Sequence, residues 1–104
     1  MKTEILLSPI EFRLLVCVEK KGRTGGKGKD IEASYERCAK QTIPKGTIYT
    51  TLQRLGAAQL LTKIKDNDAG DARSRRFTIT KAGTAAIRKN RKVYHQLAKF
   101  LIRP

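Results

Sequence analysis

Apolar side chains recur at helical spacing along much of the chain, and the first such run follows a clear start signal. Ser8 can cap a helix, Pro9 suits its first turn, and Glu11 can reach back to complete a capping box. Apolar side chains then continue to about Lys20 and surround much of the helix. Because a helix that is apolar on most sides is buried, we expect this one to lie at the centre of the core.

Two further apolar stripes predict a second and a third helix. We expect the second to run from Asp30 to about Gln41 and the third from Pro44 or Lys45 to about Ala58. Their buried faces recur at i, i+4 and i+7: Ile31, Tyr35 and Cys38 in the second, and Ile48, Leu52 and Leu55 in the third. The basic, glycine-rich stretch 22–29 is expected to be a solvated connector.

After residue 60 the pattern changes from helical spacing to alternation. Residues 61–65 alternate with period two, residues 66–71 are rich in turn-forming side chains, and residues 75–79 alternate again. These features predict a two-stranded antiparallel hairpin. Thr80 then caps a last helix that runs from Lys81 to about Leu101.

The predicted order is therefore helix, helix, helix, strand, strand, helix (α-α-α-β-β-α). A mainly α fold in which the third helix leads directly into a β-hairpin is the winged helix-turn-helix arrangement. We expect residues 1–80 to form this winged-helix domain and residues 81–104 to add a C-terminal helix to it.

The last helix carries an apolar stripe beyond the reach of the three-helix body. The stripe consists of Val93, Tyr94, Leu97, Phe100 and Leu101. Because an exposed apolar stripe marks a contact with a partner, it predicts dimerisation through this helix. The alternative is a helix that packs wholly on its own domain.

Charge indicates what the domain binds. The formal net charge is +14 over 104 residues, which favours a polyanionic partner. Residues 43–104 hold fourteen Lys and Arg against three Asp, a net of +11, whereas residues 1–42 hold nine against six, a net of +3. Nucleic acid is the expected partner, ahead of an anionic membrane surface.

The outward face of the third helix has side chains suited to reading a duplex. With the apolar stripe turned inward, this face carries hydroxyls, an amide, a phenol and two cations, and no carboxylate. Thr can bond a phosphate, Gln can pair with adenine and Arg with guanine. A merely neutral surface is the alternative. The candidate DNA contacts are Lys45, Gly46, Thr47, Tyr49, Thr50, Gln53 and Arg54.

The predicted hairpin adds cations beside this helix. They are Lys63 and Lys65, expected to project outward from the first strand, and Arg73, Arg75 and Arg76 near the start of the second. The acidic tip does not have the spacing of a calcium loop and is expected to be a turn. We therefore expect the cations that flank the tip to contact the DNA backbone or the minor groove.

Other chemistry is poorly represented. His95 is the only histidine, and the carboxylates and cysteines do not have catalytic or metal-site spacing, so we expect no enzyme activity, cofactor or metal. Cys17 and Cys38 are expected to be buried thiols, with a redox-sensing pair as the alternative. Without a signal peptide or a long apolar run, the chain is expected in the cytoplasm, associated with the nucleoid and not with a membrane.

Two segments carry a family resemblance. Pro44–Leu55, with Leu60-Leu61 after it, resembles the recognition helix of PadR-like transcriptional regulators, whose pattern is Gly-Thr-Leu-Tyr followed by Leu-x-Arg-Leu. Arg75–Gly83 is similar to that family's Arg-Arg-Tyr-Tyr-x-Leu-Thr-x-x-Gly segment, and the likeness extends over about residues 8–90. The resemblance implies a winged-helix transcriptional regulator that binds DNA.

The chain also departs from the family pattern. Gly28-Lys29-Asp30 stands where the family has His-Gly-Tyr, and Gly56-Ala57-Ala58-Gln59 stands where it has Glu-x-x-Gly. Longer members have further helices that dimerise and help to form an effector site, whereas one helix remains here. Dimerisation through that helix is expected, and small-molecule effector binding in the family's manner is not.

These observations predict a sequence-specific regulator, a repressor, that binds a pseudo-palindromic site on double-stranded DNA as a homodimer. Two alternatives stay open. One is a plasmid or phage DNA-binding factor for partition, replication or architecture, and the other is a basic winged-helix RNA-binding protein.

Overall fold

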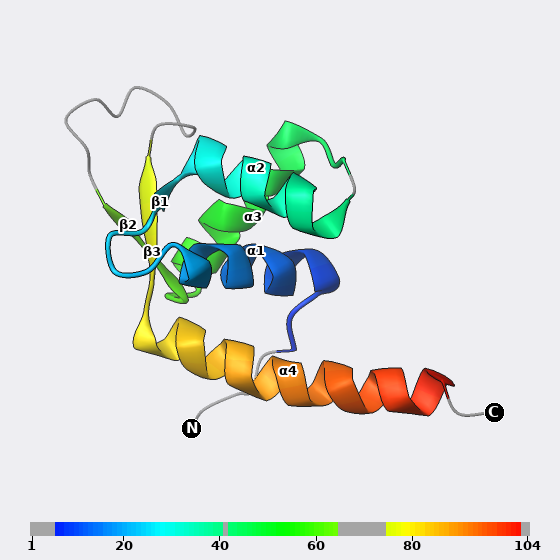
Figure 1. The fold of residues 1–104 in the computed structure, drawn as a ribbon. Coiled ribbons are helices and arrows are strands. Elements are labelled where there is room, and N and C mark those ends of the chain that lie inside the picture. Colours follow the sequence, from blue (N-terminus) through cyan, green and yellow to red (C-terminus); the bar gives the residue numbers. More distant parts are fainter. Residues whose placement is uncertain (1–5, 41, 65–74, 103–104) are drawn as a thin grey trace.

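A computed structural model describes residues 6–40, 42–64 and 75–102. In these ranges the helices α1, α2 and α3 pack together, a small sheet lies at one end of them, and α4 runs along α1 (Figure 1). The elements in chain order are α1 (Pro9–Lys20), β1 (Gly26–Lys27), α2 (Gly28–Ala39), α3 (Lys45–Ala57), β2 (Leu61–Ile64), β3 (Arg76–Ile79) and α4 (Lys81–Ile102). The predicted winged-helix architecture is confirmed, with one strand more than expected.

Helix α1 is the centre of the core, as its sequence predicts. Leu14, Leu15 and Val18 are fully buried. Its capping box is formed in both directions: the Glu11 backbone N–H donates to Ser8 Oγ at 3.2 Å, and the Ser8 N–H donates to Glu11 Oε1 at 2.8 Å. The start of α1 is therefore held by its own sequence, before any packing.

Helix α2 differs from the prediction at both ends. It begins at Gly28 and ends at Ala39, where Lys40 turns into the left-handed region at φ 53°. Ile31 and Tyr35 are buried as expected, but Cys38 is exposed, so the prediction that both cysteines are buried is wrong. The reason is that Cys38 lines an open hollow between α1 and α2 instead of packed core.

Cys17 is buried on α1, and burial raises the pKa of its thiol. A raised pKa leaves less of the reactive thiolate at neutral pH. The reading of Cys17 as a small apolar side chain therefore fits better than that of a redox sensor.

The connector predicted at residues 22–29 contributes a strand to the sheet. β1 pairs antiparallel with β3, with Gly26 opposite Phe77 and Lys27 opposite Arg76, and the strand order is β1-β3-β2. The sheet approaches so closely that a Cβ on Gly25, at φ +72°, would lie 2.2 Å from the Phe77 carbonyl oxygen. Only glycine fits this contact, so the glycine-rich sequence that suggested a loop is what admits the strand.

Strand β2 does not alternate in burial as the sequence predicts. Leu61 is buried, whereas Ile64 is 38% exposed. The register pairs Lys63 with Phe77 and Ile64 with Arg76. Since opposite residues of an antiparallel pair project from the same face, Lys63 shares the face of the buried Phe77, contrary to the expected outward direction.

Helix α4 begins where predicted and is held close to the end of α3. The Gly83 N–H donates to Thr80 Oγ1 at 2.9 Å, and that hydroxyl donates to the Gln59 carbonyl at 2.8 Å. A Cβ on Gly83 would lie 2.2 Å from the carbonyl oxygen of Leu60. These contacts fix the direction in which α4 leaves the sheet.

The middle of α4 is tied to the start of the chain. Asn90 is 2% exposed, and its Oδ1 accepts from the Leu7 backbone N–H at 2.8 Å. The Tyr94 hydroxyl donates to the Leu7 carbonyl, and its ring packs on Phe12 with centroids 5.3 Å apart. Tyr94, predicted to serve dimerisation, thus packs against its own domain because α1 lies within its reach.

None of the helices in the described ranges has the length and apolar character that a membrane span requires.

Replacement of Asn90 tests the link between α4 and the start of the chain. Asn90→Ala leaves the buried Leu7 N–H without its acceptor, so we expect the free energy of unfolding to fall by about 1–3 kcal/mol in a urea titration. The control is Lys92→Ala at an exposed position of α4, which is expected to change it by less than about 0.5 kcal/mol. Equal effects of the two substitutions would contradict the link.

Candidate nucleic-acid interface

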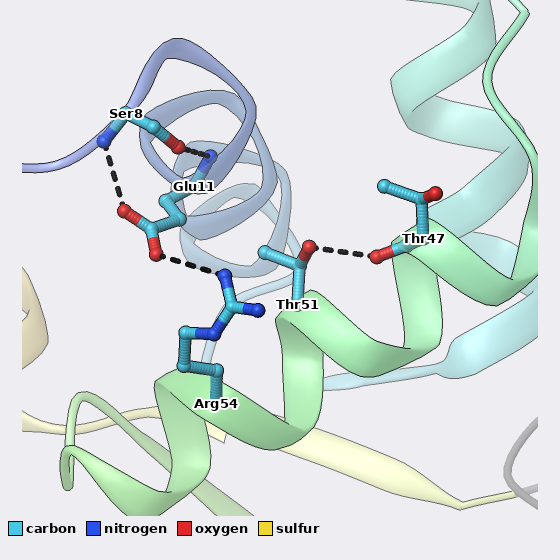
Figure 2. A network of polar contacts seen from close by, with 5 residues as sticks. All are labelled: Ser8, Glu11, Thr47, Thr51 and Arg54. Carbon is cyan, nitrogen blue, oxygen red and sulfur yellow. Dashed lines mark hydrogen bonds and ion pairs between the residues drawn. The ribbon is translucent and has the colours of Figure 1, made fainter.

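The buried stripe of α3 is the one predicted from sequence. Ile48 and Leu52 are fully buried and Leu55 is 2% exposed. Thr51, which the prediction did not place in the core, is also buried and donates its hydroxyl to the Thr47 carbonyl at 2.7 Å (Figure 2). An internal partner for this hydroxyl lets a polar side chain lie beside the apolar stripe.

The opposite face of α3 is open to solvent. A Cβ on Gly46 would meet nothing within 4 Å, so no packing demand explains that glycine. The predicted contacts that are exposed along this face are Lys45, Gly46, Thr47, Thr50, Gln53 and Arg54. Six of the seven predicted side chains of α3 are thus available to a ligand of the face.

Tyr49 is the exception on α3. It is half-buried, and its hydroxyl donates to Oε1 of the buried Glu32 at 2.7 Å, which joins α3 to α2. A helical wheel places Tyr49 at the flank of the face but cannot show that Glu32 lies within reach. Contact of Tyr49 with DNA stays a prediction, and its hydroxyl has a partner within the fold.

Arg54 is steadied by a carboxylate from another helix. Its Nη1 lies 3.6 Å from Glu11 Oε2, and the side chains are 64% and 18% exposed, respectively (Figure 2). The same Glu11 caps α1, so one carboxylate serves both the helix start and Arg54. Because an exposed ion pair contributes about 0–1 kcal/mol, the pair orients Arg54 without holding it back from a phosphate or base. The sequence could identify the cap but not this tertiary contact.

A hollow lies on each side of the exposed face. One, of about 510 Å³, lies between the start of α1 and α3, with Ile10, Thr47, Thr50 and Arg54 in its wall. The other, of about 360 Å³, lies between α3 and the sheet, with Gln53 and Lys63 in its wall. Lys63 therefore joins the face of α3, which the expected outward direction from β2 did not anticipate.

The arginines at the base of the hairpin are half-buried rather than free. The Arg76 guanidinium donates to the Thr24 carbonyl at 3.3 Å, and the Gly28 N–H donates to the Arg75 carbonyl at 2.9 Å. These contacts place both arginines beside β1, where their charge remains near the surface. Lys65 and Arg73, the other two predicted cations, lie outside the described residues.

The described ranges contain no group of three or more His, Cys, Asp or Glu side chains that could hold a metal ion.

Comparison with known proteins agrees with this geometry. Residues 15–89 match the model of the family described as "Transcriptional regulator PadR-like family". No curated protein matches the sequence.

Solved structures share the fold at low sequence identity. A PadR family transcription regulator from Clostridium difficile is similar with a TM-score of 0.72 and 19% identity, over 90% of this chain and 95% of that one. The PcaV transcriptional regulator from Streptomyces coelicolor gives 0.73 and 16%, over 93% and 62%. MepR from Staphylococcus aureus gives 0.67 and 16%, over 92% and 64%.

This chain thus spans less than two thirds of the PcaV and MepR chains, but nearly all of the Clostridium difficile one. The family match covers well over half of the sequence. The chain belongs to the PadR-like family of transcriptional regulators, and it is a DNA-binding regulator rather than an enzyme.

Proposed function

We propose that the chain recognises specific sequences of double-stranded DNA as a homodimer and represses transcription, with α3 in the major groove. The observation that carries this proposal is the exposed face of α3. It combines hydroxyls, an amide and cations, has no carboxylate of its own, and lies opposite a fully buried apolar stripe. Such a face can bond both phosphates and base edges.

The sheet supplies the second part of the proposed contact. Lys63 is exposed beside Gln53, and Arg75 and Arg76 lie at the base of the hairpin. Cations at this position can contact the DNA backbone or the adjacent minor groove while α3 occupies the major groove. Lys65 and Arg73 are proposed to continue this contact toward the hairpin tip.

Dimerisation is proposed to use the far half of α4. Val93 and Leu97 are 45% and 46% exposed, and Phe100 and Leu101 are 74% and 71% exposed. They recur at i, i+4, i+7 and i+8, so they form one stripe, and the C-terminal half of α4 extends past α1 (Figure 1). A second copy of the same stripe would cover it in a two-fold contact.

A regulator of this kind acts where the chromosome lies, so we propose that the chain works in the cytoplasm at the nucleoid. With a single helix after the sheet, we do not propose an effector site built from further dimerising helices.

Arg54→Ala tests base recognition by α3. We expect it to weaken binding to the chain's best-bound duplex by about 5- to 150-fold, the 1–3 kcal/mol of one base contact, and to weaken binding to random duplex much less. Fluorescence anisotropy at fixed salt measures both. The charge-matched control is Arg91→Ala, an exposed position of α4 that should affect the two duplexes alike and weakly. Equal losses on both duplexes for Arg54→Ala would remove its base-reading role.

Tyr49→Phe separates a structural role from a DNA contact. Loss of the hydrogen bond to the buried Glu32 carboxylate is expected to lower the free energy of unfolding by about 1.5–3 kcal/mol, measured by urea denaturation. DNA affinity at a temperature where the variant is folded is expected to change less than about twofold. The neighbouring exposed Thr50→Ala serves as the stability control. Unchanged stability together with weakened DNA binding would show instead that the hydroxyl contacts DNA.

Leu97→Glu tests the dimer. An unpaired carboxylate buried in the contact costs several kcal/mol, so the dissociation constant of the dimer is expected to rise at least about a hundredfold in sedimentation velocity. Gln96→Glu introduces the same charge at the adjacent exposed position and is expected to leave the dimer intact. A wild-type chain that stays monomeric, or a Leu97→Glu dimer of unchanged affinity, would refute the proposed interface.

A further inference from the structure

A hollow between α1 and α2 is not used by the proposed DNA contact. Its volume is about 160 Å³, and it shares no lining residue with the exposed face of α3. Its wall is mainly apolar and includes Phe12, Val16 and Cys17 from α1, and Tyr35, Cys38 and Ala39 from α2.

The size of this hollow suits a single aromatic ring. An apolar protein cavity of about 150 Å³ is large enough to bind benzene. Phe12 and Val16 offer the kind of surface that such a ring packs on, and Ala39 leaves room because its side chain is short.

One polar group in the wall lacks a partner. Tyr35 is fully buried, and its hydroxyl is the only buried side-chain oxygen or nitrogen of the described residues without a hydrogen-bond partner. A buried hydroxyl that bonds neither protein nor water is costly and rare in folded proteins. A ligand that brings an acceptor into the hollow would remove that cost.

We propose that the hollow between α1 and α2 binds a small aromatic compound that carries one hydrogen-bond acceptor. The ring packs against Phe12 and Val16, and the acceptor takes the hydrogen bond of the Tyr35 hydroxyl. Recognition therefore has an apolar part set by volume and a polar part set by one phenol.

The site is connected to two elements of the proposed function. Phe12 packs on Tyr94 of α4, and Glu32, one turn before Tyr35 on α2, holds Tyr49 of α3. An occupant that changes the spacing of α1 and α2 thereby reaches both α4 and α3. The binding itself does not depend on the proposed function, because it is measured on the protein without DNA.

The test compares two probes of nearly the same shape, acetophenone and ethylbenzene, of which only the first carries an acceptor. Titrations followed by ¹H–¹⁵N NMR of the full chain are expected to shift amides of α1 and α2 for both probes. Acetophenone is expected to bind the wild type roughly three- to tenfold more tightly, the effect of one hydrogen bond. In Tyr35→Phe, which removes only the unpartnered hydroxyl, the two probes are expected to bind alike.

A second variant tests the location. Ala39→Met fills the hollow and is expected to abolish binding of both probes, whereas Ala33→Met, at an exposed position of the same helix, is expected to leave it unchanged. Three results would overturn the proposal: no saturable binding of either probe, equal affinity of both for the wild type, or undiminished binding to Ala39→Met.

Discussion

Burial of three apolar side chains on α3 sets the rotation of that helix, and the rest of the molecule is arranged around it. With Ile48, Leu52 and Leu55 all held in the core, α3 cannot turn about its axis without exposing one of them. The face that carries Thr50 and Arg54 is then directed outward by exclusion. The core of a small domain thus determines which side chains are offered to DNA, although no core residue touches DNA in this account.

Helix α4 serves the domain and its proposed partner with different halves. Its first half is held by the close approach of Gly83 to Leu60 and by Asn90, which accepts from the Leu7 backbone. Its second half extends past α1 and leaves Leu97 and Phe100 exposed. Because the first half is fixed relative to α3, a dimer built on the second half would fix the spacing between two copies of α3. Half-site spacing on DNA would follow from that geometry.

The sequence was sufficient for features determined by local chemistry and insufficient for those determined by contacts between distant segments. The capping box of α1 and the buried stripe of α3 depend on residues within two turns of one another, and both were predicted. The pairing of β1 with β3 depends on Gly25 fitting against Phe77, and no local pattern records that contact. The same limit applies at the candidate site: the list of exposed residues on α3 was predictable, but the partner of Tyr49 and the direction of Lys63 were not.

Selection of bound duplexes from a random library, by the wild-type chain at near-physiological salt, tests the central claim most directly. If the exposed face of α3 reads bases and α4 joins two copies, the selected sequences will share a motif with two-fold symmetry. Its half-sites will be about one helical turn, or a multiple of it, apart. A chain that binds the library firmly yet enriches no motif would contradict the claim, because the charge of +14 alone would then account for binding.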